Sequence, residues 1–215
     1  IDARKIDIVY NGVSEQFNPL SAAEITQVRN KFTQGQPYFL FVGSLHQRKN
    51  ISNMLKAFDE YKKSATSPVK MVLAGAKRWW TDEMEKTLEQ MQFKSDVIFT
   101  GRVNFDDLCR ITAGALAMTY VSTFEGFGIP IIEAMRSGVP VITSNVTSMP
   151  EVAGNAALLC DPFSVSSIAE SMMKIANDEQ LRKTLIEAGL KRQNDFSWDK
   201  TAVQLWNSIE KTISS

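Results

Sequence analysis

Two glutamates, Glu125 and Glu133, stand in a stretch rich in glycine and proline whose residue types suit the binding of a phosphorylated ligand. Gly126 and Gly128 let the backbone turn sharply and leave room for a bulky anion, while Pro130 suits the first turn of a helix. Backbone N–H groups after the glycines would point at the anion, assisted by the helix dipole. Carboxylates do not bind phosphate, so their natural partners are hydroxyl groups of ribose and sugar. The stretch is typical of a nucleotide-sugar site.

A second segment supplies positive charge. Residues 38–50 predict a buried strand, a turn at Gly43, and a short loop with Arg48 and Lys49 before a helix. If the sheet brings this loop beside Gly128, a diphosphate would meet cations on one side and N–H groups on the other. No metal ion would be needed, and the sequence has no Asp-x-Asp pair or cluster with metal-ligand spacing. We therefore expect no metal and no cofactor, with the nucleotide sugar as substrate.

Short apolar runs rich in β-branched residues alternate with helical patterns along the chain. Strands are expected at residues 6–13, 38–43, 70–74, 97–100, 116–122, 139–144 and 157–159. Helices are expected at residues 50–64 and 81–91, repeatedly beyond residue 162, and finally from near Ser197. The alternation predicts an α/β fold with a doubly wound, Rossmann-like parallel sheet. Ligands of such sheets bind outside the carboxyl ends of the strands, where both segments fall.

The expected domain organisation has three parts: an interdomain segment and first strand over 1–20, a nucleotide-sugar-binding domain over 21–192, and a C-terminal helix over 193–215. Helix starts are expected at Asn104 and at Ser148, which precedes Glu151 at capping-box spacing. The chain begins with Ile1 rather than Met, which indicates a piece of something longer.

Composition narrows the class of protein. The 215 residues are 44% hydrophobic and carry 24 basic and 24 acidic side chains. A net charge of zero removes the broad field that nonspecific nucleic-acid binding needs, so a small-molecule partner is favoured. Cys109 and Cys160 lie far apart and predict free thiols in the cytoplasm. No apolar run approaches the roughly 20 residues of a membrane span, so contact with the inner face of a membrane would be peripheral.

Four stretches resemble the carboxyl-terminal, donor-binding half of GT-B glycosyltransferases of family 4, also called glycosyltransferases group 1. They are VGSLHQRKN at 42–50, FTGRV at 99–103, EGFGIPIIEAMRSGVPVI at 125–142 and SNVTSMPEVAGNA at 144–156. VYNGV at 9–13 and FSW at 196–198 also match. The resemblance covers essentially the whole chain, and its two glutamates separated by seven residues are highly specific.

The resemblance implies roles for both glutamates and for the phosphate-binding residues. Glu133 would hold the ribose hydroxyls, and Glu125 would contact the transferred sugar. Arg48 and Lys49 would bind the diphosphate and stabilise its charge as it leaves, together with the backbone of three residues in the glycine loop. These three are Phe127, Gly128 and Ile129.

The resemblance also implies a base site at Arg102 and Val103, formed largely by main-chain groups beside Gly43. Many family members carry Arg directly after that glycine, where this chain has Ser44. We therefore assign more of the phosphate charge to Arg48 and its neighbour Lys49. Which of the two reaches the phosphate stays open.

The implied activity is retaining hexosyl transfer in polysaccharide biosynthesis. The donor would be GDP-mannose or a UDP-sugar, and the acceptor a glycan or glycolipid held by an N-terminal domain outside this chain. The isolated chain would then bind a nucleoside diphosphate but transfer no sugar at a useful rate. Three alternatives stay open: a nucleotide-sugar epimerase of the same architecture, a noncatalytic nucleotide-binding module, and a retaining hydrolase whose carboxylate pair is Glu125 and Glu133.

Single residues also have ordinary interpretations. Alone, Glu133 is typical of a first-turn acid favoured by the helix dipole, and Glu125 of a solvated loop residue. His46 fits a loop surface, with donor contact as the alternative. Residues 77–80, with two cations and two tryptophans, either line an acceptor cleft or pack the next helix, with packing slightly favoured. Glu151 fits a helix cap.

Overall fold

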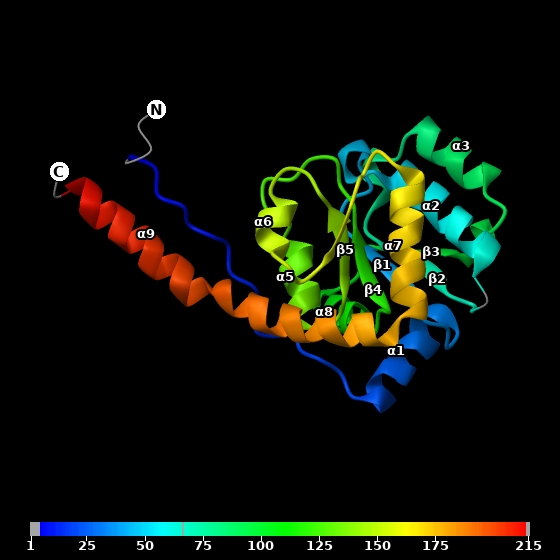
Figure 1. Cartoon of the computed structure of the whole chain (residues 1–215), viewed down its shortest axis with the longest axis horizontal. Coiled ribbons are helices and arrows are strands. Elements are labelled where there is room, and N and C mark those ends of the chain that lie inside the picture. Colours follow the sequence, from blue (N-terminus) through cyan, green and yellow to red (C-terminus); the bar gives the residue numbers. More distant parts are fainter. Residues whose placement is uncertain (1–4, 66, 214–215) are drawn as a thin grey trace.

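The computed structural model describes residues 5–65 and 67–213, and a parallel six-stranded sheet forms its centre (Figure 1). Its strands are β1 (Tyr38–Val42), β2 (Lys70–Ala74), β3 (Val97–Gly101), β4 (Ala117–Tyr120), β5 (Val141–Ser144) and β6 (Leu158–Cys160). Their order in space is β3-β2-β1-β4-β5-β6. The order reverses between β1 and β4, which is where such sheets bind ligands. The predicted doubly wound sheet is confirmed.

Strand β1 lies in the middle of the sheet and all five of its residues are buried. It pairs in parallel with β2 on one side and with β4 on the other, so that Phe39 lies opposite both Met71 and Ala117. A strand covered on both faces must be apolar throughout, which explains its uninterrupted hydrophobic run. The carboxyl end of β1, and with it Gly43, is therefore fixed at the middle of one sheet edge.

Helices cover both faces of the sheet. One layer contains α2 (Ile51–Ser64), α3 (Asp82–Gln90) and α7 (Val165–Asn177). The other contains α1 (Ala22–Thr33), α4 (Phe105–Ala113), α5 (Ile129–Arg136), α6 (Met149–Ala153) and α8 (Glu179–Arg192). Short 3₁₀ turns occupy Gln47–Lys49, Lys77–Trp79, Lys94–Asp96 and Gln193–Asp195. The helices expected at 50–64 and 81–91 are α2 and α3.

The two expected helix caps have different outcomes. Asn104 caps α4 as predicted, because its side chain accepts a 2.8 Å hydrogen bond from the backbone N–H of Asp107. Ser148 precedes α6 but makes no side-chain cap, so the cap expected from Ser148 and Glu151 is wrong. The Glu151 carboxylate instead accepts a 2.5 Å hydrogen bond from the Tyr10 hydroxyl. A contact with Tyr10, distant in the sequence, has replaced the expected local contact between Glu151 and Ser148.

The first strand, expected over residues 6–13, does not form, whereas the division into three parts stays a prediction. The segment runs beside α9 (Trp198–Ile213), the helix that leaves the body of the molecule (Figure 1). Lys211 pairs with Asp7 at 2.9 Å, while Ile8 is 65% exposed. A strand needs a sheet edge to supply its hydrogen bonds, and this path meets none. Residues 1–4 and 214–215 of the predicted parts lie outside the described residues.

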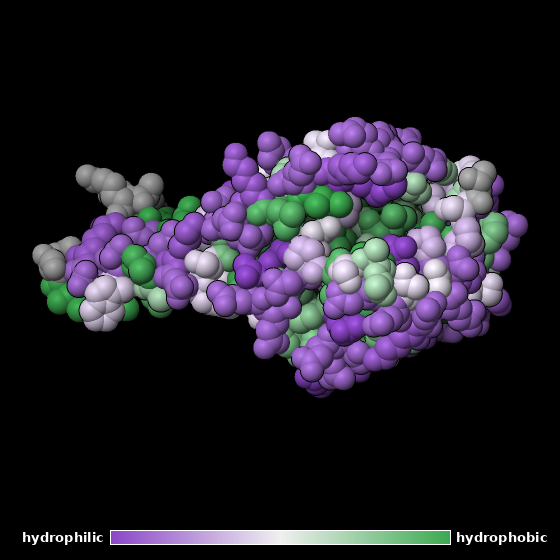
Figure 2. Space-filling view, turned by 90° about the horizontal axis from the view of Figure 1, so that it is seen from below, coloured by the Kyte–Doolittle hydropathy of each residue, from purple (hydrophilic) through white to green (hydrophobic). Residues whose placement is uncertain are grey.

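Two segments distant in the sequence, around Tyr10 and Phe196, pack on the glycine loop. The rings of Tyr10 and Phe196 lie 6.1 and 5.7 Å from that of Phe127, and 5.6 Å from each other. Beyond this cluster, α9 carries exposed apolar side chains, visible as green patches on the protruding end in Figure 2. The aromatic cluster therefore packs the segments at Tyr10 and Phe196 against the loop that carries the predicted phosphate-binding backbone.

Candidate functional site

The residues predicted to handle charge meet at the carboxyl ends of β1 and β4. The Glu125 carboxylate is 8% exposed and lies 2.5 Å from Lys49 Nζ and 2.9 Å from Arg48 Nη1. Lys49 Nζ also donates a 2.5 Å hydrogen bond to the hydroxyl of Tyr120, at the end of β4. The ordinary interpretation of Glu125 as a solvated loop residue is therefore wrong. The sequence did not predict a role for Tyr120, because an aromatic residue in an apolar strand is typical of the hydrophobic core.

Electrostatics hold Glu125 in its ionised form. Burial pushes the pKa of this carboxyl up, but hydrogen bonds from Lys49 and Arg48 outweigh burial and hold the pKa below its usual value. One carboxylate and two cations leave a net positive charge. Because the Arg48 side chain is 46% exposed, this charge is open to solvent. The arrangement can therefore attract an anion while its own buried groups stay paired.

The glycine loop supplies backbone donors beside these charges. Gly128 adopts φ +104° directly before α5, a conformation that glycine tolerates and most residues do not. Pro130 occupies the first turn of α5, as predicted. Within the described part of the chain, no protein acceptor bonds the backbone N–H groups of residues 126–129. A Cβ added at Gly126 would meet no atom within 4 Å, so the loop borders open space.

Two further residues brace this loop. The Ser148 hydroxyl donates to the carbonyl oxygens of Glu125 and Phe127, at 3.0 and 3.1 Å. Thr147 Oγ1 accepts from the backbone N–H of Glu125 at 3.3 Å. Thr147 has φ +57°, a strained conformation for a β-branched residue. Sequence reasoning missed both roles, although both residues belong to one of the stretches that carry the family resemblance.

Four residues of the predicted nucleotide site line one pocket of about 510 Å³ at the carboxyl ends of β1 and β2. They are Gly43, Ser44, Arg102 and Val103. Gly75 belongs to the same pocket, and a Cβ added to it would lie 1.8 Å from the Gly43 carbonyl oxygen. Only glycine permits this close approach of the two strand ends. The pocket is large enough for a nucleobase, but its use as a base site stays a prediction.

Glu133 lies in the second turn of α5, since the helix begins at Ile129, so the first-turn interpretation is wrong. Its carboxyl group makes no hydrogen bond or ion pair with any residue in the ranges 5–65 and 67–213. Burial alone raises its pKa to about 7. Burial, and then the nearby charge of Glu133, raise the pKa of the Cys109 thiol on α4. Phe105 and Leu108 of α4 line the 510 Å³ pocket.

In the segment at 77–80, one tryptophan packs against the core and the other is exposed, so the packing interpretation holds for one residue only. Trp80 packs against Phe99 at 5.4 Å, as favoured, and its Nε1 donates to Glu85 at 2.5 Å. Trp79 is instead 53% exposed, with its ring edge-on to His46 at 5.9 Å. The 3₁₀ turn thus holds the Trp80 indole against the protein and leaves the Trp79 indole exposed to solvent.

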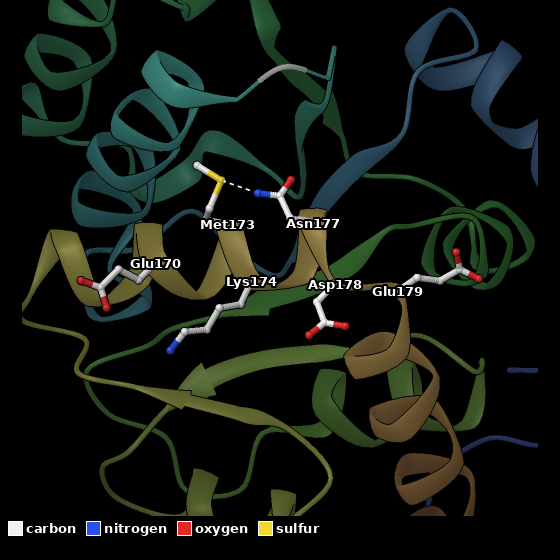
Figure 3. A pocket seen from close by; sticks show the side chains of 6 residues that line it. All are labelled: Glu170, Met173, Lys174, Asn177, Asp178 and Glu179. Carbon is white, nitrogen blue, oxygen red and sulfur yellow. Dashed lines mark hydrogen bonds between the residues drawn. The ribbon is translucent and has the colours of Figure 1, made fainter.

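Another pocket, of about 590 Å³, lies along α7 and the start of α8 (Figure 3). Its side chains include Lys174 and three carboxylates, one of which, Asp178, caps α8 by accepting from the N–H of Leu181 at 2.8 Å. Because α7 starts at the carboxyl edge of the sheet, its end lies at the opposite edge. The pocket contains none of the predicted site residues.

No group of three or more His, Cys, Asp or Glu side chains in the part that the structure describes is arranged to hold a metal ion. No helix described combines the length and apolarity that a membrane crossing requires.

Comparisons with known proteins show the family of this chain. The profile of the family "Glycosyl transferases group 1" matches residues 23–192. O-antigen chain mannosyltransferase B of Escherichia coli is 34% identical over 198 residues, which cover 92% of this chain and 52% of that protein.

Solved structures share the fold. Sucrose-phosphate synthase from Thermosynechococcus elongatus superposes with a TM-score of 0.81 at 23% identity, covering 95% of this chain and 52% of that one. The C-terminal domain of a glycosyl transferase group 1 family protein (LpcC) from Francisella tularensis gives 0.73 at 21% identity, covering 85% and 96%. The chain spans about half the length of the mannosyltransferase and of the synthase.

Proposed function

This chain belongs to the glycosyl transferases group 1 family, and from that premise we propose that it is the donor-binding part of a retaining hexosyltransferase. The proposed donor is GDP-mannose, with UDP-sugars as the second choice, and the acceptor is a glycan or glycolipid. The similarity to an O-antigen chain mannosyltransferase supports mannose as the transferred sugar. The free thiols of Cys109 and Cys160 support a reducing compartment, the cytoplasm.

The observation that carries the proposal is that a buried, ion-paired carboxylate lies beside backbone N–H groups that make no hydrogen bond to the described protein. Arg48 and Lys49 hold Glu125 in place, and the N–H groups of residues 126–129 have no protein acceptor among the described residues. A diphosphate placed against this loop would accept those N–H groups and meet the exposed guanidinium of Arg48. Charge that develops on the leaving diphosphate would be stabilised by groups already in position, which is the largest contribution in many enzymes.

The nucleoside would extend from the diphosphate into the 510 Å³ pocket. We propose that the base lies between the loop at Gly43 and Ser44 and the segment at Arg102 and Val103. The carboxylate of Glu133 would accept hydrogen bonds from the ribose hydroxyls, which would satisfy a buried group that has no partner among the described residues. Glu125, fixed by two cations, would orient the transferred sugar.

One observation favours the hydrolase alternative. The pKa of Glu125 is lowered while that of Glu133 is raised to about 7, and glycosidases use two carboxyl groups whose pKa values are driven apart. Both oxygens of Glu125 are occupied by cations, however, which opposes nucleophilic attack by this carboxylate. Two cations beside unbonded N–H groups also suit an anionic leaving group better than water. Sugar released to water without any acceptor would favour the hydrolase.

Calorimetric titration of the chain with GDP, UDP and ADP, and then with their sugars, tests the proposal. We expect GDP and GDP-mannose to bind most tightly, with the same dissociation constants in the presence of EDTA because the protein's own cations hold the phosphates. We also expect no sugar transfer by this chain alone. If no nucleoside diphosphate binds, the donor site is wrong; affinity lost in EDTA would contradict metal independence, and turnover would contradict dependence on a further domain.

A further inference from the structure

A hollow of about 410 Å³ lies beside the donor site and is lined only by polar and charged residues. They come from the β1–α2 loop, the first turns of α2 and α3, and the end of the β4 strand region. Arg48 forms the side nearest the donor site, because its guanidinium donates to Glu125 at 2.9 Å, and Thr123 lies beside it, donating its backbone N–H to the Arg48 carbonyl at 2.9 Å. Arg48 therefore belongs to both places, so a ligand in the hollow would lie next to the proposed sugar position.

Several polar groups of the hollow have no partner in the described protein. The side chains of Gln47 and Glu83 are exposed, and neither they nor the Ser52 hydroxyl make a hydrogen bond to any described residue. The Asn50 and Asn53 amides, in contrast, donate to the Pro162 carbonyl at 2.7 and 3.2 Å and hold the wall together. The hollow thus combines a fixed wall with free amide, carboxylate and hydroxyl groups.

Trp79 lies against His46, one of the residues that line this hollow. Its indole is 53% exposed and meets the His46 ring edge-on at 5.9 Å, and the Arg78 guanidinium lies 5.5 Å from it. His46 Nδ1 accepts the backbone N–H of Arg48 at 3.1 Å, so in a neutral ring Nε2 carries the proton and is available as a donor. The indole therefore has neighbours that fix its orientation, while 53% of the residue stays exposed to solvent.

A fixed indole beside free amides and carboxylates is the chemistry that recognises a sugar. The C–H groups on one face of a pyranose pack against the electron-rich face of an aromatic ring, while its hydroxyls both donate and accept hydrogen bonds. Gln47, Glu83 and the His46 Nε2 proton offer both kinds of partner. The Glu83 carboxylate disfavours an anion, and the polar lining lacks the apolar centre of a protein interface.

We propose that Trp79 and the polar hollow form an acceptor-side subsite that binds one monosaccharide unit of the glycan chain to which sugar is transferred. The proposal rests on the proposed function, since it names the acceptor of that reaction. The shared residue Arg48 places this unit beside the donor sugar. The chain would then contribute to acceptor binding as well as to donor binding.

Titration of the chain with mannotriose, maltotriose and cellotriose, without nucleotide, tests the subsite. The readout is the indole N–H signals of the four tryptophans in a ¹H–¹⁵N NMR spectrum. We expect at least one trisaccharide, mannotriose first, to shift the Trp79 signal. Trp79→Ala should weaken that binding roughly tenfold or more, the equivalent of about 1.4 kcal/mol, whereas Trp79→Phe should retain most of it. Gln47→Ala should weaken binding while leaving the indole in place.

Trp206→Ala is the matched control, because Trp206 is similarly exposed, at 60%, but lies on α9. Its variant should bind the trisaccharide as the unmodified chain does. If no trisaccharide shifts the Trp79 signal, or if Trp79→Ala binds as well as Trp206→Ala, the subsite is wrong. Titration of the same samples with GDP separates the two proposals: GDP binding without glycan binding overturns the subsite alone, and glycan binding without nucleotide binding overturns the donor site alone.

Discussion

Glu125 and Glu133 stand eight residues apart on the same loop and helix, yet the protein treats them in opposite ways. Both oxygens of Glu125 accept hydrogen bonds from cations, and its backbone is braced by Thr147 and Ser148. Glu133 has no hydrogen-bonding partner among residues 5–65 and 67–213. The pKa of Glu125 is accordingly held low, while burial raises that of Glu133 to about 7.

The difference is that the hydrogen bonds of Glu125 are already made in the protein, whereas those of Glu133 await a ligand. The Glu125 cluster satisfies its own charges and so exists in the same form before a ligand arrives, which is preorganisation. The Glu133 carboxyl has lost water on folding and gained nothing in exchange, so it costs stability until a hydroxyl donor binds. Such uncompensated groups are expected where function opposes stability. The following substitutions test this contrast, from the largest expected effect to the smallest.

Lys49→Met should produce the largest loss, because it leaves the buried Glu125 carboxylate with one cation instead of two. We expect the free energy of unfolding to fall by roughly 2–4 kcal/mol, somewhat below the cost of stranding a fully buried charge, since Arg48 still pairs. Chemical denaturation at pH 7 measures the change. Restoring a partner charge with Lys49→Arg should recover part of the loss.

Lys183→Met is the matched control for this substitution. Lys183 pairs with Glu179 at 2.8 Å, a distance like that in the buried cluster, but both side chains are exposed. An exposed pair contributes little to stability. Equal losses in the Lys49 and Lys183 variants would show that the buried cluster is no more important for folding than a surface ion pair.

Glu133→Gln should have the opposite effect on stability and a separate effect on binding. A carboxyl whose pKa is raised in the folded protein contributes fully below its unfolded pKa of about 4.5, and this contribution is lost as the pH rises through about 7. The variant should therefore be more stable than the unmodified chain at pH 8, by about 2 kcal/mol after allowance for solvent. At pH 4 the two should unfold alike.

The same substitution should weaken nucleotide binding by roughly 10- to 100-fold, because hydrogen bonds to a charged group are lost. Binding to the unmodified chain should also weaken as the pH falls below 7, by roughly tenfold between pH 8 and pH 6, since the carboxylate must be ionised to accept both ribose hydroxyls. Calorimetry measures the dissociation constant across this pH range. The same measurement on Glu133→Gln gives the pH dependence that comes from the nucleotide phosphate, and the difference between the two is the effect of the Glu133 carboxyl. Unchanged affinity in the variant would sink the ribose assignment.

Thr147→Gly should have the smallest effect. Glycine relieves the strain at φ +57° but removes the hydroxyl that accepts the Glu125 N–H, and these changes offset each other to within about 1 kcal/mol of stability. The loosened loop should lower nucleotide affinity only about twofold to fivefold. In Thr147→Asn, the asparagine tolerates the same backbone conformation and keeps a side-chain oxygen that can accept the Glu125 N–H. If Thr147→Gly were as damaging as Lys49→Met, the brace would be part of the charged cluster rather than a support for it.

Much of the fold follows from local patterns, and the exceptions have a common cause. The run at residues 38–43 is apolar throughout because β1 is covered on both faces, so its sequence alone identifies it. The run at 6–13 is also rich in β-branched residues, but it is interrupted by Asp7 and Asn11 and lies beside α9, where no neighbouring strand completes it. Ser148 has the spacing of a helix cap, yet its hydroxyl bonds to the glycine loop. In each case a contact distant in the sequence replaced the local pattern.

The sequence by itself determined the doubly wound sheet, the family, and which residues carry the charge at its carboxyl edge, because strand patterns, glycine positions and motif spacing are local properties. Only the tertiary structure decided how those residues are paired. It joined Lys49 and Arg48 to Glu125, left the Glu133 carboxyl without a partner among the described residues, and turned Trp79 outward while packing a partly buried Trp80 against Phe99. Burial and ion pairing depend on neighbours that the fold brings together from distant parts of the chain, and residue spacing along one segment does not contain them.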